Sequence, residues 1–86
     1  MDLHIFNLSR NIIEADIRKM FSVFGEVTSA IIKRDKTNDR STGYAFVNMS
    51  NDKLARQAIN NLDQTVIDGK RITISEMRQN IGNYFN

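Results

Sequence analysis

The chain has 86 residues, of which 41% are hydrophobic and 26% are charged, and this length suits one small domain folded around a single core. It contains no cysteine and one histidine, which excludes a disulfide framework, a zinc–thiolate centre and a histidine-based metal cluster. Its net charge of +2 is too small by itself to indicate a nucleic-acid partner, and no apolar run approaches the roughly 18 to 20 residues of a membrane span.

The first half of the chain predicts two strands with a helix between them. Residues 3–8 alternate between apolar positions and others, which indicates a strand with one buried face. Residues 13–24 carry apolar side chains at the i, i+3, i+4 and i+7 spacing of one helical face, and Gly25 is the expected residue after the helix C-terminus. Residues 27–34 contain β-branched side chains and predict a second strand.

The second half of the chain predicts two more strands and a second helix. Residues 35–42 contain no apolar side chain and indicate a loop, and residues 43–49 alternate as a third strand. The helical spacing returns in residues 55–62. The Asp-Gly pair at residues 68–69 is a hairpin-turn signal, and residues 71–75 alternate as the fourth strand.

The order strand, helix, strand, strand, helix, strand predicts an α+β, ferredoxin-like fold. Right-handed crossovers place both helices on one face of a four-stranded antiparallel sheet, so the other face has no helix to cover it. We expect this domain to span residues 1–78 and a C-terminal tail to span residues 79–86. Alternation assigns these side chains to the uncovered face: His4, Phe6, Ile31, Lys33, Tyr44, Phe46, Asn48, Thr73 and Ser75.

The uncovered face is expected to carry aromatic rings beside the positive charge. Exposed rings form the kind of apolar patch that marks a binding site, and flat rings stack on bases. Residues 33–40 carry four basic and two acidic side chains, whereas the rest of the chain is neutral. Two ordinary explanations stay open: the charged loop is simply solvated, and Tyr84 and Phe85 of the tail cover the rings.

Several segments resemble the RNA-recognition motif family. Residues 42–49, Thr-Gly-Tyr-Ala-Phe-Val-Asn-Met, resemble its octamer K/R-G-F/Y-G/A-F-V-x-F/Y and match it at five specified positions. Residues 3–8, Leu-His-Ile-Phe-Asn-Leu, resemble its hexamer, and residues 35–41 resemble its basic loop. The resemblance covers about residues 2–77 and is strongest to short, single-domain members of bacterial and chloroplast-related lineages.

The resemblance implies that the uncovered face binds RNA. Tyr44 and Phe46 would stack on or against nucleotides, and His4 stands where the hexamer normally has another stacking ring. A protonated His4 would also contact a phosphate. Phe6 stands where the family has a smaller residue, and it either adds ring area or fills the space of a base. The full set of residues expected to bind RNA is His4, Phe6, Lys33, Arg40, Tyr44, Phe46, Asn48, Ser75 and Arg78.

One departure from the family pattern lowers the expected affinity. Thr42 replaces the Lys or Arg that opens the octamer and would pair with a phosphate, so one charge-assisted contact is lost. Lys33 and Arg40 are the nearest candidates to replace it. We therefore expect modest affinity and low sequence selectivity for single-stranded RNA.

The sequence leaves one other ligand and one other function open. Single-stranded DNA stays open as a second ligand, and a degenerate fold that acts as a protein–protein interaction module is the alternative function. No carboxylate pair or glycine-rich phosphate loop indicates an enzyme, and no pattern implies a cofactor or a metal. We expect the protein to be a monomer. We also expect it in the cytoplasm, because residues 1–4 lack the layout of a secretory signal.

Overall fold

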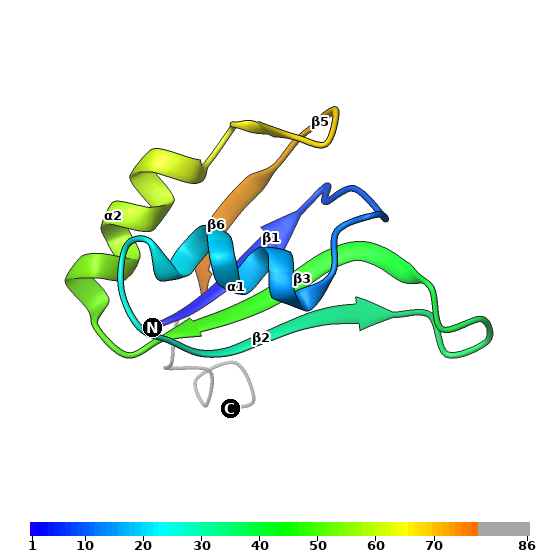
Figure 1. Cartoon of the computed structure of the whole chain (residues 1–86), viewed down its shortest axis with the longest axis horizontal. Coiled ribbons are helices and arrows are strands. Elements are labelled where there is room, and N and C mark those ends of the chain that lie inside the picture. The colour runs from blue at the N-terminus through cyan, green and yellow to red at the C-terminus, as the bar shows by residue number, and fades with distance from the viewer. Residues whose placement is uncertain (78–86) are drawn as a thin grey trace, which may run out of the picture.

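The computed structural model describes residues 1–77, and Arg78 and the expected tail 79–86 lie outside the described residues. Within residues 1–77 the chain forms two helices and six strands (Figure 1). Neither helix in this part of the chain is long and apolar enough to cross a membrane. In chain order the elements are β1 (Asp2–Phe6), α1 (Glu14–Ser22), β2 (Val27–Arg34), β3 (Ser41–Met49), α2 (Asp52–Leu62), β4 (Val66–Ile67), β5 (Lys70–Arg71) and β6 (Thr73–Met77).

Four strands form one antiparallel sheet in the order β2-β3-β1-β6. The central strands β1 and β3 pair with His4 opposite Phe46 and Ile5 opposite Ala45. β2 pairs with the other side of β3, and β6 pairs with the other side of β1. The predicted ferredoxin-like α+β fold is therefore confirmed.

The core lies between the helices and one face of the sheet. In β1, Leu3 and Ile5 are fully buried, whereas the residues that alternate with them are only half-buried. Both helices contribute to the same buried cluster, so they cover the same sheet face. Each large apolar side chain that leaves water contributes roughly 1.5–3 kcal/mol. The buried apolar side chains of the described part are Leu3, Ile5, Leu8, Ile17, Phe21, Val27, Ile32, Ala45, Val47, Met49, Ala55, Ala58, Ile72 and Ile74.

Side-chain oxygens satisfy backbone amides where the helices begin. The Oδ1 of Asn51, the residue before α2, accepts a hydrogen bond from the Leu54 N–H at 2.9 Å, as an N-cap residue does. Ile13 precedes α1 and has no polar side chain, but the Ile13 N–H donates to Asp16 Oδ2 at 3.0 Å. α1 ends at Ser22, earlier than predicted, where the Phe24 N–H donates to the Phe21 carbonyl at 3.0 Å and tightens the last turn.

Gly25 follows α1, but not directly, because the helix ends at Ser22. Among the glycines of the described residues, positive φ occurs at Gly43 and Gly69 and not at Gly25. Gly25 instead allows close packing against α2. A Cβ at this position would lie 2.9 Å from Leu54 Cδ1, so the missing side chain makes room for Leu54.

The fourth predicted strand is divided into two segments by a change of pairing partner. β4 and β5 form a two-stranded hairpin around Asp68 (φ 50°) and Gly69 (φ 80°), as the Asp-Gly pair predicts. Hydrogen bonding across this hairpin continues to Ile72, whose N–H donates to the Thr65 carbonyl at 2.9 Å. From Thr73 onward the chain pairs with β1 instead. The single strand predicted over residues 71–75 is therefore wrong at its start, because alternation does not reveal which neighbour a strand pairs with.

Each edge strand of the sheet has an outward amide covered by a carboxylate. On β2, the Ile32 N–H donates to Glu14 Oε2 at 3.3 Å. On β6, the Ile74 N–H donates to Asp63 Oδ1 at 2.7 Å. Uncovered edge amides are templates for pairing with another chain, so these contacts remove one pairing position from each edge.

Gly43 holds the start of β3 against the loop that follows β1. Its carbonyl accepts a hydrogen bond from the Leu8 N–H at 2.9 Å, and its φ is 88°. A Cβ would lie 3.2 Å from the Leu8 carbonyl oxygen, a backbone atom that cannot move independently. Both the conformation and the space therefore require glycine here.

We expect Gly43→Ala to lower the free energy of unfolding by about 1–3 kcal/mol, because it adds backbone strain and a close contact. Gly69→Ala is the matched control: φ is also positive there, but a Cβ would have no neighbour within 4 Å. Urea denaturation of both variants measures the difference. Equal losses in the two variants would show that the contact with Leu8 adds nothing to the strain.

Candidate nucleic-acid interface

Four rings lie together on the face of the sheet that the helices leave uncovered. His4 and Phe6 come from β1, and Tyr44 and Phe46 come from the adjacent β3; together we call them the aromatic surface. The His4 ring stacks on Phe46 with centroids 4.6 Å apart and lies 4.1 Å from Phe6. Phe6 meets Tyr44 edge-on at 5.6 Å. These are the arrangements that aromatic pairs prefer, so the rings form one continuous platform.

The rings lie on the two central strands, and exposed side chains of the edge strands flank them. Ile31 on β2 lies opposite Phe46, and Ser75 on β6 lies opposite His4. Tyr44 is 42% exposed and Ile31 is 56% exposed. Each of the nine side chains that alternation assigned to this face is exposed or half-buried, which confirms their placement. Their part in binding stays a prediction, and the alternative cover by Tyr84 and Phe85 concerns residues outside the described part of the chain.

Phe6 adds to the platform. Its ring contacts the His4 ring and stands perpendicular to the Tyr44 ring. Of the two roles considered for Phe6, this geometry favours added ring area. Together the two rings form a larger surface than the imidazole at residue 4 alone.

His4 is less basic than an ordinary histidine. Partial burial disfavours its charged form, and the nearby Lys33 ammonium adds repulsion, so the pKa of His4 is lowered. The imidazole is therefore neutral at pH 7. A neutral ring suits stacking, whereas the expected charged contact with a phosphate requires a more acidic solution or a phosphate close enough to raise the pKa.

The predicted cations of residues 33–40 do not all face the aromatic surface. Lys33 is exposed on β2, close enough to His4 to influence its pKa. Arg34 instead forms an ion pair with Glu14 of α1, with 2.9 Å between Nη2 and Oε1. Arg40 is exposed beyond the start of β3, near Arg10. Lys33 and Arg40 thus both belong to the β2–β3 hairpin, and Arg40 shares a hollow with Arg10.

Glu14 is held in its ionised form at this ion pair. Partial desolvation opposes ionisation, but hydrogen bonds from the Glu14 and Ile32 backbone and from Arg34 outweigh it, so the pKa of Glu14 is lowered. The Arg34 side chain is consequently held toward α1, on the helix-covered side of β2.

Asn48, Ser75 and Arg78 are the remaining residues predicted to bind RNA. Asn48 donates to Asp2 Oδ1 at 2.5 Å and accepts from Thr28, so its amide already has partners within the domain. Ser75 is exposed and no hydrogen bond within residues 1–77 engages its hydroxyl. Arg78 lies outside the described residues. Of Asn48 and Ser75, Ser75 is the better placed for a polar contact with a ligand.

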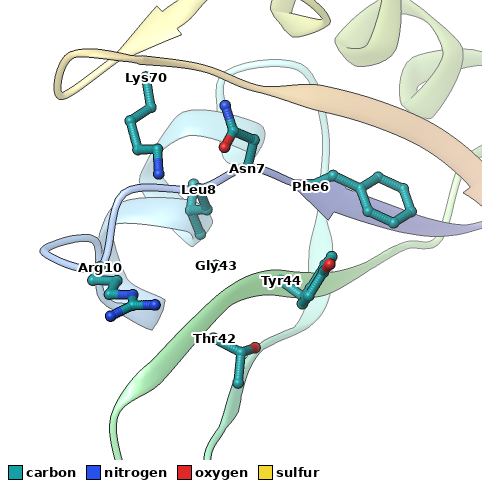
Figure 2. Close-up of a pocket in the computed structure, with 8 residues that line it drawn as sticks. All are labelled: Phe6, Asn7, Leu8, Arg10, Thr42, Gly43, Tyr44 and Lys70. Carbon is teal, nitrogen blue, oxygen red and sulfur yellow. The ribbon is translucent and has the colours of Figure 1, made fainter.

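A hollow that sequence reasoning missed continues the aromatic surface at one end. Its volume is about 280 Å³, and Figure 2 shows its aromatic wall on one side and two cations on the other. No local pattern connects these cations, because Arg10 follows β1 and Lys70 begins β5. The lining residues are Phe6, Asn7, Leu8, Arg10, Thr42, Gly43, Tyr44 and Lys70.

Hydrogen bonds attach the β4–β5 hairpin to the loop that follows β1. Asn7 Nδ2 donates to the Arg71 carbonyl at 2.9 Å. Asp68 Oδ2 accepts from Ser9 Oγ at 2.5 Å and from Asn11 Nδ2 at 3.0 Å. Both bonds lower the pKa of the Asp68 carboxyl, and the bond from Ser9 has the larger effect. The two walls of the hollow are therefore held together by side chains from segments far apart in the sequence.

A four-stranded antiparallel sheet with two helices on one face and a cluster of rings on the other defines the class as ferredoxin-like α+β folds. The chain belongs to the RNA recognition motif family, which matches residues 3–73. The resemblance seen in the octamer and hexamer is thereby confirmed. The single strongest sequence signal, the octamer, lies on β3 at the centre of the sheet.

Several curated proteins are similar to this chain. Small RNA binding protein 1 of Cucumis sativus is 36% identical over 63 residues, which cover 73% of this chain and 39% of that protein. The 28 kDa chloroplastic ribonucleoprotein of Nicotiana sylvestris is 34% identical over 73 residues, which cover 85% of this chain and 26% of that protein. RbpD of a Nostoc species is 31% identical over 78 residues, which cover 91% of this chain and 83% of that protein. The chain thus spans less than half of the two plant relatives but most of the Nostoc relative.

Solved structures share the fold. The crystal structure of RNA Binding Protein PG1 superposes with a TM-score of 0.89 and 30% identity, covering 92% of this chain and 95% of that one. The Sxl-lethal protein in complex with RNA superposes with a TM-score of 0.85 and 26% identity, covering 90% of this chain and 46% of that one.

We expect the His4 imidazole to titrate below about 6.5 in the folded chain, as followed by NMR of its ring. The unfolded chain then binds the proton more readily, so the His4 contribution to stability falls as pH drops below about 6.5 and is complete above it. Lys33→Gln removes the repulsion and should move the midpoint upward. An unchanged midpoint in Lys33→Gln would contradict the contribution of Lys33.

We expect Asp68→Gly to speed amide hydrogen exchange in the β4–β5 hairpin, because it removes the acceptor of two hydrogen bonds while keeping the turn conformation accessible. Asp68→Asn is the matched control, since its one amide oxygen still accepts from both Ser9 and Asn11. Exchange that is equally fast in the two variants would argue against attachment through this oxygen.

Proposed function

We propose that the chain binds single-stranded RNA by stacking bases on the aromatic surface. The observation that carries the proposal is the contiguity of the His4, Phe6, Tyr44 and Phe46 rings on an uncovered sheet face. Membership of the RNA recognition motif family supports it, as do an RNA-binding relative from cucumber and a similar fold in a complex with RNA.

The available contacts favour modest affinity. Base stacking contributes about 1–3 kcal/mol per base and tolerates every base. Arg34 is engaged by Glu14 and Asn48 by Asp2, so fewer polar groups are free to read or hold the strand than the sequence predicts. Low sequence selectivity follows, and single-stranded DNA of the same length is expected to bind to the same rings.

The domain is proposed to act as a monomer in RNA binding. The carboxylates of Glu14 and Asp63 cover an outward amide on each edge strand, which disfavours pairing of two sheets at their edges. Protein recognition by the bare face is the competing function, but a platform of four contiguous rings favours flat bases over an irregular protein surface.

We expect Tyr44→Ala and Phe46→Ala each to weaken binding of a mixed-sequence RNA oligonucleotide by about 1–3 kcal/mol, or roughly 5- to 150-fold. Tyr44→Phe keeps the ring and should bind nearly as well as the original chain. Fluorescence anisotropy measures the affinities, and circular dichroism checks that each variant is folded. Unchanged affinity in both alanine variants would refute base stacking on this surface.

A further inference from the structure

We propose that the hollow between Arg10 and Lys70 is a phosphate-binding subsite for the RNA strand where it leaves the aromatic surface. This inference rests on the proposed function and adds a phosphate contact to the stacking of bases. The ligand is defined by its chemistry as a phosphate, either within the strand or at its end.

The two cations of the hollow have no competing partner in the described part of the chain. Within residues 1–77, the side chains of Arg10 and Lys70 make no hydrogen bond or ion pair. Two other arginines are engaged: Arg18 donates to the Val27 carbonyl at 2.7 Å, and Arg71 donates to the Gln64 carbonyl at 3.1 Å. Arg10 and Lys70 are thus available for an anion.

The balance of charge distinguishes this hollow from its neighbour. The adjoining hollow, about 220 Å³, shares Arg10 and adds Arg40, but Asp35 also lines it. Hydrogen bonds from Thr37 lower the pKa of Asp35 and keep it ionised near neutral pH. Two cations without a carboxylate favour a phosphate more than two cations beside one.

A third hollow on the helix side of the molecule favours anions even less. It is lined by Lys19 together with Asp16 and Asp68. Carboxylates outnumber cations there, so it repels a phosphate. Among these three hollows, the one between Arg10 and Lys70 combines the greatest positive charge with a wall of the aromatic surface.

The aromatic wall connects the subsite to the stacked bases. Phe6 and Tyr44 belong both to the aromatic surface and to the lining of the hollow, as Figure 2 shows. A nucleotide stacked on Tyr44 therefore has its backbone next to the hollow. The volume of about 280 Å³ compares with roughly 30 Å³ per liquid water, so a phosphate fits with some of its hydration.

The contacts of the hairpin hold both cations at the hollow, across from its aromatic wall (Figure 2). The bonds from Asn7 to Arg71 and from Ser9 to Asp68 fix the β5 segment that carries Lys70 against the loop that carries Arg10. A site whose charges are already in position loses less entropy when it binds. Arg10 supplies a planar fork of donors, and Lys70 supplies a compact charge.

The test measures RNA affinity for Arg10→Gln, Lys70→Gln and the double variant between 50 mM and 1 M salt. Each lost phosphate contact should reduce the salt slope by about 0.7. If the variants and the original chain bind RNA equally at 1 M salt, this change in slope predicts weaker binding at 50 mM salt. The affinity should fall about 8-fold for each cation removed and about 65-fold for both. Lys53→Gln, a single charge removed from α2, is the matched control and should leave the slope unchanged.

RNA oligonucleotides with different ends show whether the bound phosphate lies within the strand or at its end. The same RNA is used without terminal phosphates, with a 5′-phosphate and with a 3′-phosphate. A slope change in every oligonucleotide supports a phosphate within the strand, and a change confined to one phosphorylated end supports a terminal phosphate.

The subsite and the proposed function fail in distinguishable ways. Loss of affinity in Tyr44→Ala and Phe46→Ala, with unchanged slope and affinity in the double Gln variant, would overturn the subsite and leave RNA binding intact. Unchanged affinity in the aromatic variants would overturn RNA stacking itself. Urea unfolding of the double variant, compared with that of Lys53→Gln, confirms that a loss of binding is not a loss of fold.

Discussion

Antiparallel pairing of β1 with β3 is the constraint on which the rest of the structure depends. With His4 opposite Phe46 and Ile5 opposite Ala45, the same alternation sends aliphatic side chains into the core and aromatic ones to the bare face. A shift of one residue in either strand would exchange the two faces of that strand. The burial of Leu3 and Ile5 therefore also holds the rings in position, so stability of the core and formation of the aromatic surface are linked.

The loops add a second layer of organisation at one end of this sheet. Gly43 joins the start of β3 to Leu8, and Asp68 joins the β4–β5 hairpin to Ser9 and Asn11. These contacts involve few buried apolar groups, yet they determine where the cations stand relative to the rings. The platform is a product of regular strand pairing, whereas the charged hollow beside it is a product of specific polar contacts between loops.

Charge in the sequence and charge available at the surface are different quantities. Four basic side chains cluster in residues 33–40, but Arg34 is bound by Glu14 on the far side of β2. Arg10 and Lys70, which look like isolated charges in the sequence, line one hollow. The sequence does not show which cations are free, because Arg34 and Glu14 are 20 residues apart and Arg10 and Lys70 are 60 residues apart.

The sequence by itself determined the order of elements, the fold, the uncovered face and the four rings on it, because alternation and helical spacing are local properties. It also located the Asp-Gly turn. Only the tertiary structure decided that the chain changes partners at Ile72, that Gly25 makes room for Leu54 and that His4 is less basic than usual. It also decided that Arg10 and Lys70 line the same hollow. Each of these depends on contacts between distant segments, and no pattern within either segment records them.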